Sequence, residues 1–332
     1  MTLRRDWLSR THEEVLEPDL EIVDTHHHLW EVAGKYGIYD LDDLHLDTGS
    51  GHRVVETIFI EASASYRTSG PESMRPIGET EFVASRAKLS DQGDRARITG
   101  IVGRADLSMG ACVRDVLDGH VEAADGRFRG VRHTGARTDD ATIAANRTQP
   151  VPGLYGLPSF RDGARVLADM GLSFDAWQYH PQLHEVVELA RAVPGLVMVV
   201  NHIGGPLAIG GYLGRDAEVR ADWQAGIEAL AGLPNVYMKL GGLGTVRSGA
   251  TWDEDDRPPT SDQVIERWGE RLLFCIDRFG PSRCMFESNF PVDGRMMSYT
   301  VLWNAFKKLT VGFTDPERAD LFAGTARRAY RL

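Results

Sequence analysis

Residues 182–202 read QLHEVVELARAVPGLVMVVNH and combine an amphipathic segment, a Pro-Gly break and an apolar run. In residues 182–193 the apolar side chains return every three or four positions, which predicts a helix with one buried face. Residues 196–200 carry no polar side chain, as expected of a strand that is covered on both faces. A helix that leads into such a strand is the repeating unit of a parallel α/β sheet.

The same alternation extends in both directions along the chain. Further helices are predicted over residues 161–170, 218–231, 262–279 and 316–330, the last of which should close the outer ring. Because eight such units close readily into a barrel, we predict a (β/α)8 barrel, the TIM-barrel fold. The alternative is an open doubly wound sheet, but no strand precedes a G-x-G-x-x-G or Walker motif, which disfavours its nucleotide-binding version. The eight predicted strands cover residues 21–28, 56–62, 97–102, 128–133, 172–177, 196–202, 235–240 and 283–287.

The length of 332 residues suits one barrel with long loops, and no Pro- or Ser-rich linker divides the chain. We therefore expect a single domain over residues 1–332, with residues 1–19 as an N-terminal arm. The long predicted loops follow strands one, two, four and six, so they surround the end of the barrel where active sites of this fold form. These loops cover residues 33–53, 63–80, 134–159 and 204–215.

Composition narrows the class of partner. The formal net charge of −11 disfavours nucleic acid, and no apolar run approaches the roughly 18 residues that would predict a membrane span. The three cysteines are widely spaced and odd in number, which indicates neither a disulfide framework nor a thiolate metal site. Since the N-terminus lacks the apolar core of a signal peptide, we expect a cytoplasmic protein that acts on a small-molecule substrate. A homo-oligomer is a possibility that composition does not decide.

Five of the 11 histidines lie at the carboxyl ends of predicted strands. His26 and His28 end strand one, and the two-residue period of a strand turns both to the same side. His133, His180 and His202 follow strands four, five and six. Two imidazoles on one strand form half of a zinc site, although each histidine alone could equally be a hydrogen-bonded structural residue. As a group at one barrel mouth they predict a metal or acid-base site.

Four motifs together resemble the amidohydrolase-2 group of the amidohydrolase superfamily, from the first predicted strand to the last. The group includes fuconolactonase- and rhamnonolactonase-type sugar lactonases, 2-pyrone-4,6-dicarboxylate lactonase and metal-dependent nonoxidative decarboxylases, and the lactonase branch is the most similar. The resemblance implies a TIM-barrel hydrolase without specifying its substrate. The motifs are DTHHHLW at 24–30, NHIGGP at 201–206, KLGGL at 239–243 and FESNFPV at 286–292.

The resemblance also implies roles for the histidines. His26 and His28 would be the metal-ligand or substrate-facing pair, and His180 and His202 the histidines of strands five and six. We expect a metal held by His26, His28 and His180, or those imidazoles alone, to polarise the carbonyl, and His202 to assist proton transfer. The metal would be divalent, with Zn²⁺ the first choice, although some lactonase relatives work without a tightly bound metal. In metal-binding relatives the strand-eight motif ends in an aspartate that ligates the metal and accepts a proton from water, and here that place holds Asn289.

An amide can orient water, but it cannot accept a proton as a carboxylate does. The general base must therefore be another residue. Glu287 and Asp293 are the nearby carboxylates, and Asp293, in the loop, is better placed to reach the mouth. His180 and His202 are the alternatives that we favour, because an imidazole titrates near ~6.5.

Three charged residues are candidates for binding substrate. Glu61 ends strand two. Lys239 ends strand seven and would polarise a carbonyl or pair with Glu61, unless it is a solvated strand end. Arg67 has the guanidinium fork that matches a carboxylate, although a surface loop residue is the more ordinary interpretation.

Arg132 is a further candidate for a substrate carboxylate. It neighbours His133, and since adjacent strand residues face opposite sides, only one of the two should point into the barrel. Trp177 and Tyr179 lie beside the mouth and could wall a ring-shaped substrate.

The sequence therefore predicts a hydrolase that opens a lactone or similar cyclic ester of a small carboxylated or sugar-like substrate with activated water. One alternative is a metal-dependent nonoxidative decarboxylase or a hydrolase of another bond, because the same site can polarise a carboxylated ring. A third interpretation, a barrel that binds a small ligand without turnover, is suggested by the missing strand-eight aspartate.

Overall fold

The computed structural model describes residues 3–34, 37–143 and 149–332, and its centre is a parallel sheet of eight strands. Two hydrogen bonds of 2.8 Å, from Asn289 N to His26 O and from His28 N to Phe290 O, join the end of the first strand to the chain that follows the last. They close the sheet, so the predicted (β/α)8 barrel is confirmed. In sheet order the strands are β1 (Glu21–His27), β4 (Arg53–Ile60), β5 (Arg97–Gly103), β6 (Phe128–Arg132), β7 (Ser173–Ala176), β8 (Met198–Val200), β9 (Val236–Leu240) and β10 (Cys284–Phe286).

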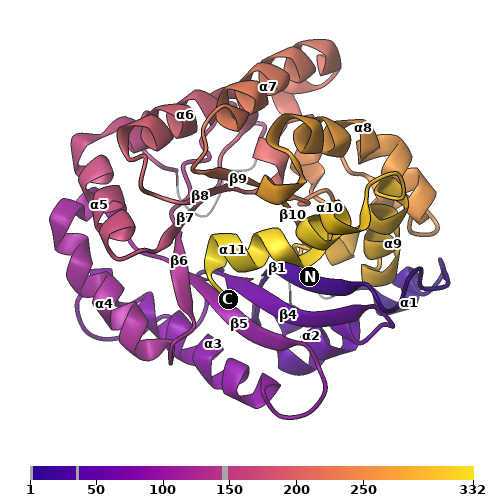
Figure 1. The fold of residues 1–332 in the computed structure, drawn as a ribbon, viewed down its shortest axis with the longest axis horizontal. Helices are drawn as coiled ribbons and strands as arrows, with labels where there is room; N and C mark the ends of the chain where they lie inside the picture. The colour runs from indigo at the N-terminus through magenta and orange to yellow at the C-terminus, as the bar shows by residue number, and fades with distance from the viewer. Residues whose placement is uncertain (1–2, 35–36, 144–148) are drawn as a thin grey trace.

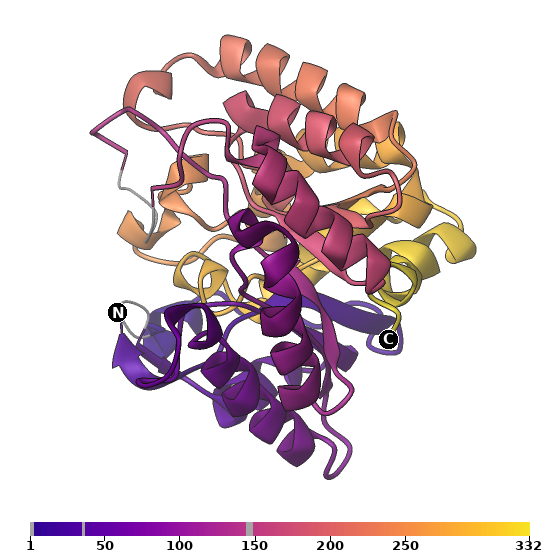
Figure 2. The ribbon, with the colours of Figure 1, turned by 90° about the vertical axis from the view of Figure 1, so that its left-hand side faces the viewer.

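A ring of helices surrounds this barrel (Figure 1) and packs side by side along its outside (Figure 2). The predicted helices at 161–170, 182–193, 218–231 and 262–279 are present, with ends that shift by at most three residues. Their apolar stripes face the strands, as the periodicity requires. The ring consists of α3 (Ile77–Ser90), α4 (Val113–Ala123), α5 (Pro158–Asp169), α6 (Leu183–Ala192), α7 (Asp216–Ala231), α8 (Ser261–Phe279) and α9 (Tyr299–Leu309).

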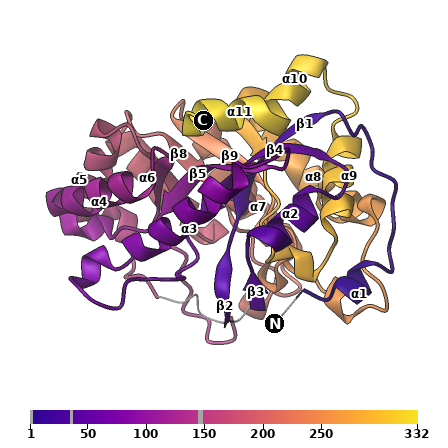
Figure 3. The same ribbon diagram turned by 90° about the horizontal axis from the view of Figure 1, so that it is seen from below.

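The prediction that residues 316–330 close the outer ring of helices is wrong. Helix α10 (Asp315–Ala319), a π-helical turn at Asp320–Gly324 and helix α11 (Thr325–Tyr330) instead lie across the amino-terminal end of the barrel (Figures 1 and 3). Their alanines and Tyr330 pack against side chains inside the barrel, and Arg327 pairs with Glu21 and Glu56 near the strand starts. This segment keeps water from the apolar interior at that end, which is the physical reason for its place.

The chain between β1 and β4, predicted as a loop, also contains regular structure. The hairpin β2 (Trp30–Gly34) and β3 (Gly37–Tyr39) stands at the carboxyl end of the barrel, opposite α11 (Figure 3), and helix α2 (Leu41–Thr48) follows it. Asp40 caps α2 in a capping box with Asp43, a local signal that apolar periodicity does not report. Residues 35–36 and 144–148 of the predicted loops lie outside the described residues.

The first residues of the chain lie against the body of the barrel. Helix α1 (Arg5–Leu8) is tied to it by Arg5, which pairs with Asp47 at 2.8 Å, and by Trp7, whose indole N–H donates to the backbone oxygen of Asp255 at 2.9 Å. Within the described part of the chain, no helix is both long and apolar enough to cross a membrane.

Candidate active site

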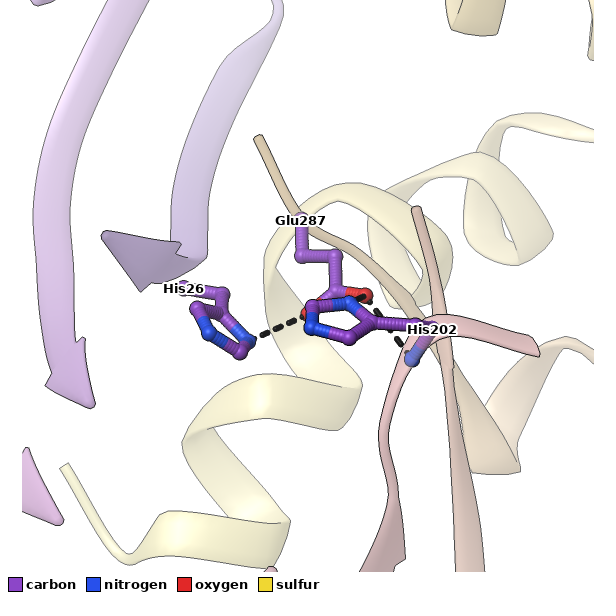
Figure 4. Close-up of side chains that lie close together, drawn as sticks. All are labelled: His26, His202 and Glu287. Atoms are coloured by element: carbon purple, nitrogen blue, oxygen red, sulfur yellow. Dashed lines mark hydrogen bonds and ion pairs between the residues drawn. The ribbon is translucent and has the colours of Figure 1, made fainter. Parts of the chain in front are cut away.

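The carboxylate of Glu287, directly after β10, lies between two imidazole rings (Figure 4). Its Oε2 is 2.7 Å from Nδ1 of His26 at the end of β1, and its Oε1 is 2.7 Å from Nδ1 of His202 beyond β8. Oε1 also accepts the backbone N–H of His202 at 3.1 Å. Because a carboxylate only accepts, its hydrogen bond with His202 assigns the proton of that neutral ring to Nδ1 and the lone pair to Nε2.

Alternation along the last strand explains why Glu287 points inward. Met285, two residues earlier, belongs to the side-chain cluster inside the barrel, and residues two apart share a face. Asn289 would be the next inward position, but its φ of 54° breaks the alternation, and its amide nitrogen donates to Asp293 Oδ1 at 2.7 Å. His202 also has a positive φ, 55°, a costly conformation for non-glycine residues that is frequent at functional sites.

His28 is held in a similar way to His26. Its Nδ1 donates to the backbone oxygen of Ile60 at 2.7 Å, and its Nε2 lies 3.3 Å from Nε2 of His26. Arg132 places Nη1 3.3 Å from the same His26 nitrogen, while its Nε donates to Glu61 Oε1 at 2.9 Å. Burial, and after it the positive charge of Arg132, holds the pKa of His28 well below its usual value.

A small pocket opens beside His202. The indole of Trp177 meets the His202 ring edge to face, with ring centroids 4.7 Å apart. Gly242 has φ of 66° and lies so close to the imidazole that a Cβ would be 2.3 Å from Nδ1, so glycine is required there. The pocket is largely apolar, and its wall includes Trp177, Tyr179, Leu243, Arg247 and Trp268.

Comparison with known proteins decides the family. The family model described as amidohydrolase matches residues 23–332. This chain belongs to the amidohydrolase family. It is therefore an enzyme of the hydrolase class, as the sequence predicted.

This amidohydrolase is similar to several known proteins along almost its whole length. It is 32% identical to protein y4mH of Sinorhizobium fredii over 331 residues, which are 95% of this chain and 99% of that protein. It is 26% identical to L-fucono-1,5-lactonase of Burkholderia multivorans over 324 residues, 93% of this chain and 96% of the lactonase. A crystal structure of an amidohydrolase from Burkholderia multivorans with bound zinc has a TM-score of 0.73 at 24% identity, covering 94% of this chain and 99% of that one.

Side chains of metal-ligating types lie at the mouth of the amidohydrolase. His26, His202 and Glu287 have ligand atoms within 4.8 Å of one another, and such a group could hold a metal ion. Two ligands of one tetrahedral zinc ion lie roughly 3.3 Å apart, however, because each is about 2.0–2.1 Å from the metal. The 2.7 Å contacts of Glu287 with both rings are therefore shorter than the spacing of two zinc ligands.

The pair of imidazoles of His26 and His28 is also unsuited to a metal. The Nε2 atoms of His26 and His28 are 3.3 Å apart and have the right spacing, but the guanidinium of Arg132 adjoins one of them. The amide nitrogen of Asn289 is turned away to Asp293. As folded, these residues do not fit a resident divalent metal.

His180 and His133 are held by neighbours other than the His26–Glu287–His202 group. His180 accepts the backbone N–H of Leu207 through Nδ1 at 3.2 Å, and burial lowers its pKa to about 4. His133 accepts the backbone N–H of Leu107 at 3.3 Å, so of the adjacent pair it is Arg132 that points to the mouth. The structure thus does not bring His180 to the proposed ligands His26 and His28.

Lys239 lies elsewhere than predicted, whereas Arg67 is the surface loop residue that the more ordinary interpretation predicted. Lys239 is neither a solvated strand end nor a partner of Glu61: it is fully buried and donates to Asp175 Oδ2 at 3.0 Å, because it is an inward residue at mid-barrel. Arg67 lies on an exposed loop and donates to Glu81 Oε2 at 3.2 Å, so it does not belong to the His26–Glu287–His202 group.

The loop carboxylate Asp293 is fully buried, and this burial raises its pKa to about 7. The residue that sequence reasoning undervalued is Glu287, which we weighed only as a substitute for the missing aspartate. The signal was available, because Met285 and Glu287 are two residues apart on a strand whose alternate positions face inward.

Proposed function

We propose that this amidohydrolase hydrolyses a lactone of a small sugar-like or carboxylated acid, with water activated by His202. The observation that carries the proposal is the 2.7 Å hydrogen bond from Nδ1 of His202 to Glu287. Because the ring proton is on Nδ1, Nε2 keeps a lone pair that can accept a proton, and the ring lines the pocket. The lactone as substrate class is supported by the similarity to L-fucono-1,5-lactonase.

In this mechanism Nε2 of His202 accepts a proton from water while the water oxygen attacks the lactone carbonyl. The imidazolium that forms is stabilised by the carboxylate of Glu287, which also keeps the ring in the required tautomer. When the bond between the carbonyl carbon and the ring oxygen breaks, His202 returns the proton to the departing oxygen. The product is the open hydroxy acid, and no step passes through a metal.

The pocket has a volume of about 10 Å³, which holds one water, and its wall carries side chains suited to a lactone ring that enters beside that water. Trp177 and Tyr179 offer aromatic faces to a ring, and Arg247 is a guanidinium in the same wall that suits a carboxylate or a polar ring substituent. We propose these three residues as the substrate contacts. His180, His133 and Lys239 have no role in the proposed mechanism.

The test is acid release from a panel of sugar-acid 1,5-lactones, followed by pH-stat titration. We expect His202→Asn to lower kcat by on the order of 10²-fold or more, the usual worth of a general base. The matched control is His184→Asn, an exposed histidine on α6 whose Nδ1 faces the oxygen of Pro181. Equal activity of wild type and His202→Asn would refute the mechanism.

The same experiment separates the rival functions. Carbon dioxide release from a carboxylated ring, without acid release from any lactone, would make the protein a decarboxylase. Tight retention of a lactone with no product would make it a binding protein. Either result overturns the proposal.

A further inference from the structure

The Nε2 atoms of His26 and His28 face each other at 3.3 Å. Nδ1 of His28 donates to the backbone oxygen of Ile60, and Nε2 of His26 accepts from the guanidinium of Arg132, which can only donate. In neutral rings both Nε2 atoms therefore carry lone pairs. Two lone pairs at this distance repel, so a positive group beside them stabilises the pair.

Arg132 supplies that positive group. Its Nη1 is 3.3 Å from Nε2 of His26, within reach of a hydrogen bond donated to the imidazole lone pair. A guanidinium stays charged at every pH at which a protein folds, so it can serve as a permanent cation.

The guanidinium is fixed in this position by its neighbours. Its Nε donates to Glu61 Oε1 at 2.9 Å, and its Nη2 donates to the backbone oxygen of Glu61 at 2.5 Å. The side chains of Arg132 and Glu61 are only 10% and 8% exposed, so water screens this ion pair weakly. Arg132 ends β6 and Glu61 follows β4, so two barrel strands hold the pair in place.

We propose that Arg132 is a resident cation that takes the place of a divalent metal at the His26–His28 pair. The mouth keeps a fixed positive charge, and the two imidazoles do not retain a metal ion. This inference concerns the same mouth as the proposed function, but it does not depend on which substrate is opened.

The experiment measures zinc, with no substrate present. The metal content of wild-type protein is determined after exposure to Zn²⁺ and gel filtration, and zinc affinity is measured by competition with a chromophoric chelator. We expect wild type to emerge with far less than one equivalent. The double variant Glu61→Gln/Arg132→Met removes the guanidinium without leaving its carboxylate partner charged, and should bind Zn²⁺ at least about tenfold more tightly, or roughly 1.4 kcal/mol.

Two control variants identify the cause. Glu61→Gln alone keeps the guanidinium and should bind zinc as weakly as wild type. Adding His28→Ala to the double variant should abolish the gain, because one imidazole of the pair is lost.

Two results would overturn the inference. One is a full equivalent of zinc in wild type that His28→Ala removes, a measurement that holds even if the double variant does not fold. The other is a folded double variant that binds zinc no more tightly than wild type. Neither result depends on lactone opening, so failure of the proposed function would be seen separately, in the acid-release assay.

Discussion

Replacing Glu287 by glutamine tests the centre of the site. The carboxylate accepts a hydrogen bond from Nδ1 of His202 at 2.7 Å, and its other oxygen lies 2.7 Å from Nδ1 of His26 as a close polar contact. Glutamine has nearly the same shape but only one acceptor oxygen, and its other atom is an NH₂ donor. One ring must therefore lose its partner or change tautomer. If that ring is His202, its Nε2 becomes protonated and can no longer accept a proton from water.

The expected loss of kcat follows from the hydrogen bonds that change. A hydrogen bond to a charged group contributes about 1.5–3 kcal/mol, and each 1.36 kcal/mol in the barrier is about tenfold in rate. Loss of the charge opposite the imidazolium alone should lower kcat by about 10- to 150-fold. A forced tautomer adds to this, since the equivalent change of carboxylate to amide in a Ser-His-Asp triad costs about 10⁴-fold.

The assay is steady-state lactone hydrolysis, with KM and kcat determined separately and the imidazole tautomers followed by ¹⁵N NMR. KM should change little, because the pocket wall does not include Glu287. The control is Glu188→Gln on α6, whose side chain is 58% exposed and 3.4 Å from Arg161. A kcat for Glu287→Gln within about threefold of wild type, at unchanged tautomer signals, would refute this account of the site.

Three further predictions concern stability, measured by urea unfolding. Lys239→Met should cost about 3–5 kcal/mol because it leaves Asp175 buried without its cation, and adding Asp175→Asn should recover part of the loss; equal stability of single and double variants would contradict this. Tyr330→Phe removes a hydroxyl that donates to Asp175 at 2.9 Å and should cost about 1.5–3 kcal/mol, whereas no loss would show that α11 is held by packing alone. His120 is buried, and burial lowers its pKa to about 4. Below pH 6.5 the unfolded chain therefore binds a proton that the folded chain does not, so the free energy of unfolding falls as the pH is lowered toward 4. His120→Gln should make this slope shallower by one proton, about 1.4 kcal/mol per pH unit, and an unchanged slope would count against the buried neutral ring.

Much of the barrel was predictable because its signals are local. The apolar run at 196–200 and the three- and four-residue spacing at 182–193 report burial directly, and β8 and α6 lie where these patterns predict them. The place of residues 316–330 was not predictable in this way. A helix with an apolar face reads the same whether that face covers the side of a barrel or its end.

The candidate site, too, was predictable only in part from the sequence. By itself, the sequence determined that His26 and His28 share a side of β1 and that His202 ends its strand near them, because side-chain direction alternates with each residue. Only the tertiary structure decided that Glu287 joins two of these rings and that Arg132 adjoins His26. Such contacts join residues that are far apart in the chain, such as His26 and Glu287, and they exist only once the barrel has closed and the backbone has turned after β10.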